Sequence, residues 1–168
     1  MNKHPDTRTS AIIAVVRGTA FALITGIYIQ IPGQLHSYLW CVYIGFFLTM
    51  ALGVPKQKYF PCIASLMCGY FWGFLYLNAA GWMSNFSPFS ATVNTVAAEF
   101  LLTSALLFIH LRFLSNTPFH IIPAIFAGVA SLFAAGGWEP APFCALSIVI
   151  GISMAYLTDL IIGYLCRK

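Results

Sequence analysis

Residues 62–73 read CIASLMCGYFWG, and they lie in an apolar run that extends from residue 59 to residue 82. An α-helix rises about 1.5 Å per residue, so a run of this length can cross a hydrocarbon core of about 30 Å. A transmembrane β-strand would alternate polar and apolar residues over about 10 positions, and this run does not alternate. The stretch therefore predicts a transmembrane α-helix.

The composition of the chain favours the same fold class. Of the 168 residues, 60% are hydrophobic and only 7% are charged, and the mean hydropathy is +0.86. A soluble domain carries about 25% charged residues, which cover the surface that faces water. We therefore expect an all-α membrane protein that is embedded in, and has as a partner, the lipid bilayer.

Six apolar runs can be separated along the chain, and Gly, Pro, Ser or Asn residues mark the breaks between them. A polar tail, residues 1–10, precedes the first run, which is too long for a signal peptide and is expected to remain as a helix. The fifth run is the shortest and is rich in glycine. A tilted, a thin and a partly re-entrant segment therefore all stay open as alternatives for it. The predicted spans are residues 11–31, 37–54, 59–82, 91–111, 119–135 and 142–165.

Basic residues outside the spans follow a regular pattern. They lie before the first span, between the second and third, after the fourth and after the sixth, whereas the other loops contain no Lys or Arg. Cytoplasmic loops of membrane proteins carry an excess of these residues. The pattern predicts six spans with both termini in the cytoplasm, and it rests on Lys3, Arg8, Lys56, Lys58, Arg112, Arg167 and Lys168.

The opening stretch has a counterpart at residues 144–155, CALSIVIGISMA, with Cys, Ser, Gly and a second small residue at the same spacing. Small residues are common in membrane helices, so a chance echo stays open as an alternative. If the repeat is real, residues 11–83 and 84–166 are two units of three spans each. Because three is an odd number, the second unit would be inserted upside down, giving an inverted 3+3 repeat of the kind found in channels and transporters.

Small residues in both stretches also predict close packing between helices. Small-x-x-x-small faces let two helix backbones approach closely, and we expect the third and sixth helices to cross in this way. The five cysteines lie within or at the ends of apolar runs, where packing is expected rather than disulfide formation or metal binding. The predicted packing residues are Gly69, Gly73, Gly151 and Ala155.

Three ionisable side chains lie inside predicted spans, where charge is costly and function is a default hypothesis. Arg17 and Asp159 both lie about two turns from the cytoplasmic ends of their helices, so we predict a structural ion pair between them. Glu99 is different, because it lies about 12 Å along its helix and its side chain is too short to reach water. It must line a wet cavity, pair with a donor on a neighbouring helix, or be protonated.

Polar neighbours of Glu99 extend this candidate site. Thr95, Glu99 and Thr103 share one helix face, whereas Asn94 projects about 140° away from Glu99. We expect the shared face to line a polar cavity between the two halves of the chain. The solute-pathway candidates are Glu99, Thr95, Thr103, Asn94, Tyr76 and Asn78.

No arrangement for catalysis stands out. The sequence contains no His-x-x-x-His, Gly-x-Ser-x-Gly or Walker motif, and the loops are too short for a soluble enzymatic site. The histidines at positions 36, 110 and 120 lie near span ends, which favours interfacial side chains over a metal site. We therefore expect no enzyme, no cofactor, no metal and no nucleic-acid partner.

A pattern of Gly, Pro and aromatic residues runs through the second half of the chain: Pro123, Phe126, Gly128, the turn FAAGGW at residues 133–138, Pro142, Leu146, Gly151 and Tyr156. This pattern is similar to that of the YcdZ-like family of small bacterial inner-membrane proteins, whose function is unknown. A fainter match covers Cys41, Tyr43, Gly69 and Trp72, so the resemblance extends over most of residues 37–160 and implies an inner-membrane location.

A second resemblance is local. Residues 69–80, GYFWGFLYLNAA, look like a Gly-Phe-x-Tyr-Leu stretch of the acid-gated urea and amide channels, which also have six spans. Those channels would run this helix in the opposite direction, so no filter residue is transferred.

These features together favour a channel or transporter for a small polar or neutral solute, expected to assemble as a homo-oligomer. The rival hypothesis is a scaffold or accessory subunit that transports nothing.

Overall fold

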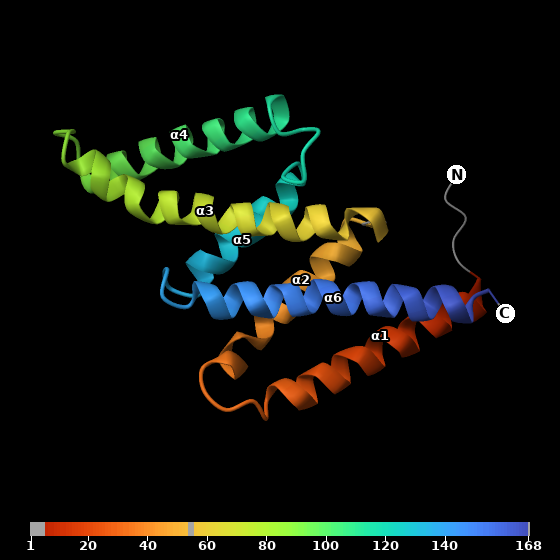
Figure 1. Cartoon of the computed structure of the whole chain (residues 1–168). Coiled ribbons are helices and arrows are strands. Elements are labelled where there is room, and N and C mark those ends of the chain that lie inside the picture. The colour runs from red at the N-terminus through yellow and green to blue at the C-terminus, as the bar shows by residue number, and fades with distance from the viewer. Residues whose placement is uncertain (1–5, 54–55, 168) are drawn as a thin grey trace. The chain divides into compact units, whose positions relative to one another are not determined.

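The computed structural model describes residues 6–53 and 56–167. This part of the chain forms six α-helices and two short 3-10 turns, and it contains no β-strand (Figure 1). The predicted all-α fold class is confirmed. The helices are α1 (Thr7–Tyr28), α2 (Leu39–Ala51), α3 (Tyr59–Ser84), α4 (Ala91–Arg112), α5 (Ile122–Ala134) and α6 (Ala141–Leu165), with η1 (Leu35–Tyr38) before α2 and η2 (Lys56–Lys58) before α3.

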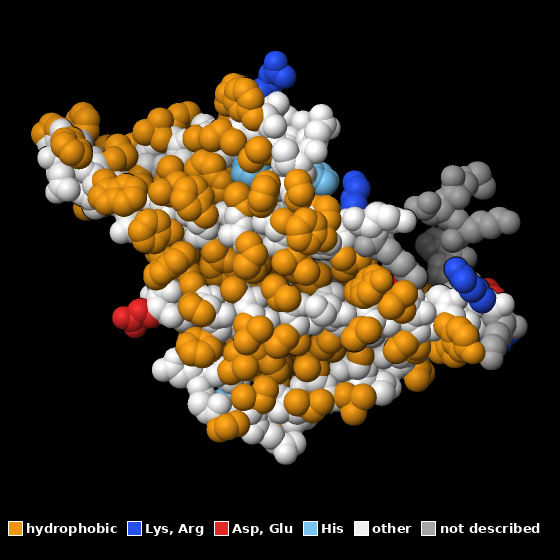
Figure 2. Space-filling view, in the orientation of Figure 1, with side chains coloured by type: hydrophobic (Ala, Val, Ile, Leu, Met, Phe, Trp, Pro, Cys, Tyr) orange, Lys and Arg blue, Asp and Glu red, His pale blue; other side chains and the backbone are white. Residues whose placement is uncertain are grey.

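Four of the helices, α1, α3, α4 and α6, are long and apolar enough to cross a membrane. Their outer surfaces suit lipid: Val96, Phe100 and Leu111 of α4 are all more than 60% exposed. Figure 2 shows hydrophobic side chains over most of the visible face. Large exposed apolar surfaces of this kind mark contact with a membrane or a partner.

The other two helices, α2 and α5, have 13 residues each, which is about 20 Å at 1.5 Å per residue. Each is followed by a glycine with positive φ, Gly53 at 54° and Gly136 at 87°. Such a residue ends a helix because other side chains rarely adopt this conformation. The predicted second and fifth spans therefore contain helices shorter than a 30 Å core, and their passage across the membrane stays a prediction.

The start of α1 differs from the predicted span. The helix begins at Thr7, inside the polar tail, because the Asp6 carboxylate accepts a hydrogen bond of 2.7 Å from the Thr9 backbone N–H. Ser90 caps α4 in the same way, through the backbone N–H of Val93. Side-chain caps of this type satisfy backbone donors that have no partner within the helix.

The helices are grouped into two compact units. The first unit contains α1, α2 and the part of α6 from Ser147 onward. The second unit contains α3, α4, α5 and the beginning of α6. Each unit thus combines helices from both of the sequence repeats that the cysteine stretches predict.

In the second unit, glycines bring α3 and α5 into backbone contact. A Cβ atom on Gly69 would lie 2.1 Å from the carbonyl oxygen of Ile125, and one on Gly128 would lie 2.4 Å from that of Leu66. Gly73 faces the Leu132 side chain, where a Cβ would come within 2.9 Å. Only residues without a side chain allow this close approach.

In the first unit, the same contact joins α2 and α6. A Cβ atom on Gly151 would lie 2.0 Å from the carbonyl oxygen of Val42, and one on Gly45 would lie 2.2 Å from that of Ile148. Ala155, one turn further along α6, is 1% exposed. The prediction that small residues join the third and sixth helices is therefore wrong about the partners of the glycines, because Gly69 and Gly73 contact α5 and Gly151 contacts α2.

The two units resemble each other in detail. Helices α1 and α4 both have 22 residues, and α2 and α5 both have 13. Gly69 and Gly151 are each the eleventh residue of their helix, and Gly45 and Gly128 are each the seventh. Taken by itself, each unit is therefore built from a 22-residue helix, a 13-residue helix and a longer helix that crosses the short one at glycine.

The first unit contains an ion pair inside its apolar helices. Nη2 of Arg17 on α1 donates a 3.0 Å hydrogen bond to Oδ1 of Asp159 on α6. The two side chains are 25% and 34% exposed. The ion pair links the two longest helices of this unit, α1 and α6.

Asp159→Leu is expected to destabilise the protein by about 1 kcal/mol, because the Arg17 guanidinium would lose a charged partner in an apolar setting. The double variant Arg17→Leu, Asp159→Leu should recover most of this loss. Leucine suits these places, because the second unit has leucine at the corresponding positions. Leu101 is the eleventh residue of α4, as Arg17 is of α1, and Leu77 is the nineteenth of α3, as Asp159 is of α6. Thermal unfolding in detergent measures both effects, and a double variant less stable than the single one would contradict the interpretation.

Candidate functional site

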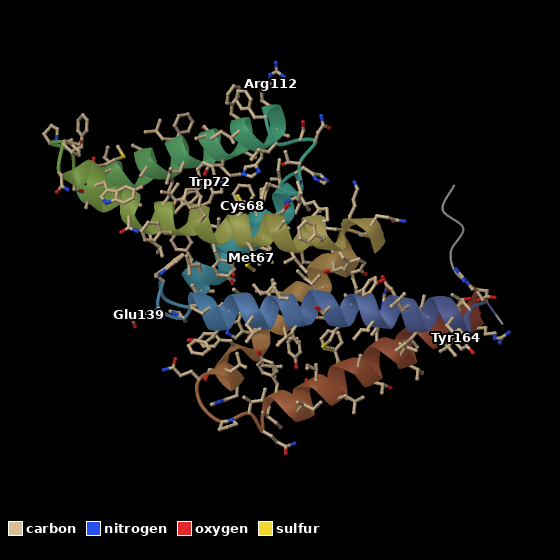
Figure 3. All side chains as sticks on the ribbon, in the orientation of Figure 1. Met67, Cys68, Trp72, Arg112, Glu139 and Tyr164 are labelled. Atoms are coloured by element: carbon tan, nitrogen blue, oxygen red, sulfur yellow. The ribbon has the colours of Figure 1, made fainter. Side chains whose placement is uncertain are left out.

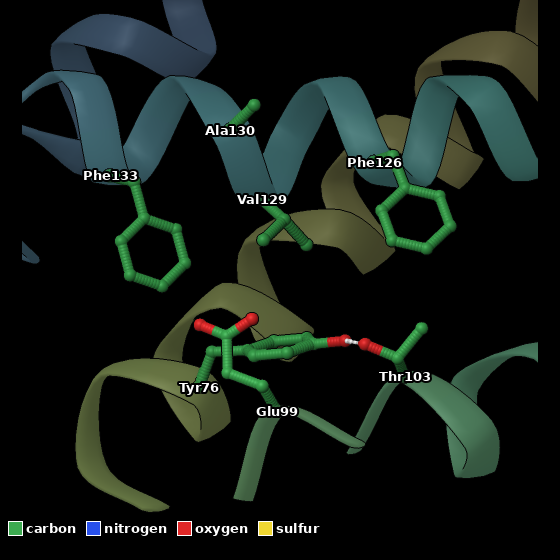
Figure 4. A pocket seen from close by; sticks show the side chains of 7 residues that line it. All are labelled: Tyr76, Glu99, Thr103, Phe126, Val129, Ala130 and Phe133. Atoms are coloured by element: carbon green, nitrogen blue, oxygen red, sulfur yellow. Dashed lines mark hydrogen bonds between the residues drawn. The ribbon is translucent and has the colours of Figure 1, made fainter. Parts of the chain in front are cut away.

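A groove in the second unit brings together three of the predicted polar residues. Its volume is about 360 Å³. One side is formed by α3 and α4 and the other by α5 (Figure 4). Lining side chains are Tyr76 from α3, Glu99 and Thr103 from α4, and Phe126, Val129, Ala130 and Phe133 from α5.

Glu99 is the charged group of this groove. It is the ninth residue of the 22-residue α4, so it lies well away from both ends of the helix. Its side chain is exposed to the groove, and no hydrogen bond or ion pair to its carboxylate is found within residues 6–53 and 56–167. The groove therefore holds a carboxylate whose partner the described chain does not supply.

The polar groups beside Glu99 are bonded to each other. The hydroxyls of Tyr76 and Thr103 are 2.5 Å apart and share a hydrogen bond between α3 and α4. This bond fixes the Tyr76 ring next to the Glu99 side chain, as Figure 4 shows. The ring also meets Phe133 of α5 edge to face, with centroids 6.3 Å apart at 72°.

The opposite wall is apolar. Phe126, Val129, Ala130 and Phe133 follow the helical spacing of three and four residues, so they form one face of α5. The groove thus has a mostly apolar lining with three polar side chains. Tyr76 belongs to the first predicted repeat, and the other lining residues belong to the second.

The remaining pathway candidates lie elsewhere. Thr95 donates to the carbonyl oxygen of Ala91 at 2.9 Å, and Asn78 donates to that of Phe74 at 2.7 Å. Both therefore bond to their own helices. Asn94 is 1% exposed and ties the start of α4 to the end of α3, because its amide donates to the Ser84 hydroxyl and the Phe89 carbonyl at 3.2 Å and 3.3 Å.

His110 is a buried residue of the second unit, although its place near the end of a span predicts an interfacial side chain. It is 1% exposed. Its Nδ1 lies 2.6 Å from the carbonyl oxygen of Phe119, so Nδ1 carries the proton, and Nε2 accepts the indole N–H of Trp72 at 3.1 Å. Trp72 and Cys68, which lies 3.7 Å from the same Nε2, lie on α3 (Figure 3). The imidazole thereby joins α4, the following loop and α3.

His110→Leu is expected to cost about 2 kcal/mol of stability, because the Trp72 indole N–H and the Phe119 carbonyl would lose their partner in a buried place. His120→Leu is the matched control, since the bond found for its ring among the described residues is a local one, to the Thr117 carbonyl three residues earlier. Chemical or thermal unfolding in detergent should separate the two variants. Equal stability of both variants would show that the hydrogen bonds of His110 to Trp72 and Phe119 contribute nothing to the stability of the protein.

Within the described residues, no three His, Cys, Asp or Glu side chains lie close enough together to bind a metal ion. The groove contains a single ligand-type side chain, Glu99.

Comparison with known proteins gives a family. A family model described as "Protein of unknown function (DUF1097)" matches residues 10–163. Searches of curated proteins and of solved structures returned no match. Because the match covers all six helices almost completely, the chain belongs to the DUF1097 family of proteins of unknown function.

Proposed function

We propose that this protein is a membrane channel or transporter that moves a small polar or neutral solute, without catalysing a reaction on it. The groove around Glu99 is the proposed solute site. The observation that carries the proposal is a carboxylate in the middle of an apolar helix that no side chain in the described part of the chain pairs with.

A carboxylate at the centre of a membrane helix costs about 3 kcal/mol on insertion scales. Arg17 offsets such a cost at Asp159 by pairing with it, whereas none of the described residues pairs with Glu99. A site that admits water and a polar solute would supply the missing interactions and would explain why the charge is tolerated.

The first unit has an apolar groove at the corresponding place. Its position equivalent to Glu99, the ninth residue of α1, is Val15. Val15 lines a groove that contains only apolar side chains, from Ala11, Ile12, Val15, Val16 and Leu165. The two units share their architecture, but the polar groove occurs in the second.

The wider setting is part of the same proposal. We infer a bacterial inner-membrane protein with both termini in the cytoplasm, since the loop charges follow the positive-inside rule. The YcdZ-like resemblance agrees with this location. The shared helix lengths and glycine positions support an inverted repeat. A homo-oligomer is proposed because a chain of 168 residues has little material to enclose a wide cavity by itself.

Flux into liposomes tests the proposal. Vesicles that contain the purified protein are compared with empty vesicles in a light-scattering assay, using glycerol, urea, acetamide and methylammonium as solutes. We expect at least one of them to enter several times faster when the protein is present. Rates equal to those of empty vesicles for the whole panel would favour the rival, a scaffold or accessory subunit.

A further inference from the structure

We propose that the groove binds a small organic ammonium ion, with its positive charge held by Glu99. This inference rests on the proposed function, because it names the class of solute that the same groove would take. It begins with charge: among the seven lining residues there is one carboxylate and no basic side chain. The site therefore favours a cation over an anion.

Within the described residues, no basic side chain pairs with Glu99. Arg17 is the one Lys or Arg there that lies within the apolar part of a helix, and it is paired with Asp159. Arg112 lies at the end of α4, about 20 Å along the helix from Glu99 at 1.5 Å per residue. A bound cation would supply a counter-charge that the described residues do not.

The walls of the groove favour an organic cation over a hydrated metal ion. Three aromatic rings, those of Tyr76, Phe126 and Phe133, line the groove around the carboxylate (Figure 4). Aromatic faces attract ammonium groups through their negative π-surfaces, and cages of this kind recognise quaternary ammonium ligands. A metal ion would instead need several oxygen ligands, and Glu99 is the one carboxylate here.

The size and the hydroxyl groups agree with this class. A volume of about 360 Å³ lies at the lower end of the range for small-ligand pockets. Tyr76 and Thr103 bond to each other, so they compete little for the carboxylate. The groove thus combines one negative charge with an apolar, aromatic surround, which matches an alkylated nitrogen cation.

Binding of tetramethylammonium to the full-length protein in lipid nanodiscs tests the inference by calorimetry. The neutral control ligand is tert-butanol, which has nearly the same shape and no charge. We expect tetramethylammonium to bind the native protein and to bind Glu99→Gln at least tenfold more weakly, since a hydrogen bond or contact with a charge is worth about that factor or more. The affinity for tert-butanol should not change.

Two further variants make the result specific. Glu139→Gln removes the same charge at the α5–α6 turn, outside the groove (Figure 3), and should bind tetramethylammonium like the native protein. Phe133→Leu keeps the carboxylate but removes a ring, and should weaken tetramethylammonium binding about fivefold while sparing tert-butanol. An affinity that is equal in the native protein, Glu99→Gln and Phe133→Leu would overturn the inference.

The test separates this inference from the proposed function. Flux of neutral solutes without tetramethylammonium binding would overturn the ammonium site and leave a neutral-solute pathway standing. Tetramethylammonium binding that depends on Glu99, without flux of any solute, would support the site and contradict transport.

Discussion

Gly69→Ala and Gly151→Ala are each expected to destabilise the protein by about 3 kcal/mol, at the upper end of what overpacking costs. The added methyl groups would lie 2.1 Å and 2.0 Å from the backbone carbonyl oxygens of Ile125 and Val42. A flexible side chain could move aside, but these contacts are backbone. The crossing helices would therefore have to separate, and much of the packing in each unit would be lost.

Gly18→Ala provides the matched control. It is also a glycine in a long helix, but a Cβ there meets nothing within 4 Å. The change should be neutral or should stabilise α1 by up to about 1 kcal/mol through helix propensity. Unfolding in detergent, followed by circular dichroism, compares the three variants. Full stability of Gly69→Ala and Gly151→Ala would contradict the close crossings.

Ala130→Trp is expected to reduce solute flux to the level of empty vesicles. Ala130 is exposed and lines the groove from α5. An indole at this position would occupy the space that a solute needs, and the exposed position should accept it without unfolding the helix. The rate of vesicle re-swelling measures the effect.

Ser104→Trp is the matched control for Ala130→Trp. Ser104 is exposed on α4 next to Thr103 but does not line the groove. The same bulky side chain there should leave flux unchanged. Full flux through Ala130→Trp would show that solute takes another path.

Several features could be predicted from the sequence because they depend on one helix at a time. The apolar runs predict where helices lie, and the depth of Arg17 and Asp159 in their spans predicts their ion pair, which the structure contains at 3.0 Å. Glu99 is a candidate for the same reason, since a carboxylate far from both helix ends is unusual. Charge and hydropathy carry these signals without knowledge of neighbouring helices.

Other features depend on which helices are neighbours, and the spans alone do not contain that information. Gly69 is recognisable as a packing residue, but its partner on α5 becomes evident only when α3 and α5 are seen to cross. Thr95 shares a helix face with Glu99, yet it lies beyond the groove. The ring of Phe133 is one of many apolar residues in its span, and only its position opposite Glu99 gives it a role.

Solute flux in Glu99→Gln vesicles tests the central claim most directly. The substitution keeps the size of the side chain and removes its charge, and Glu139→Gln controls for the loss of an acidic residue elsewhere. For whichever solute the native protein conducts, we expect Glu99→Gln to lower the protein-dependent rate about tenfold or more, with Glu139→Gln unchanged. Native rates in Glu99→Gln and also in Glu99→Ala would contradict the assignment of this groove as the solute pathway.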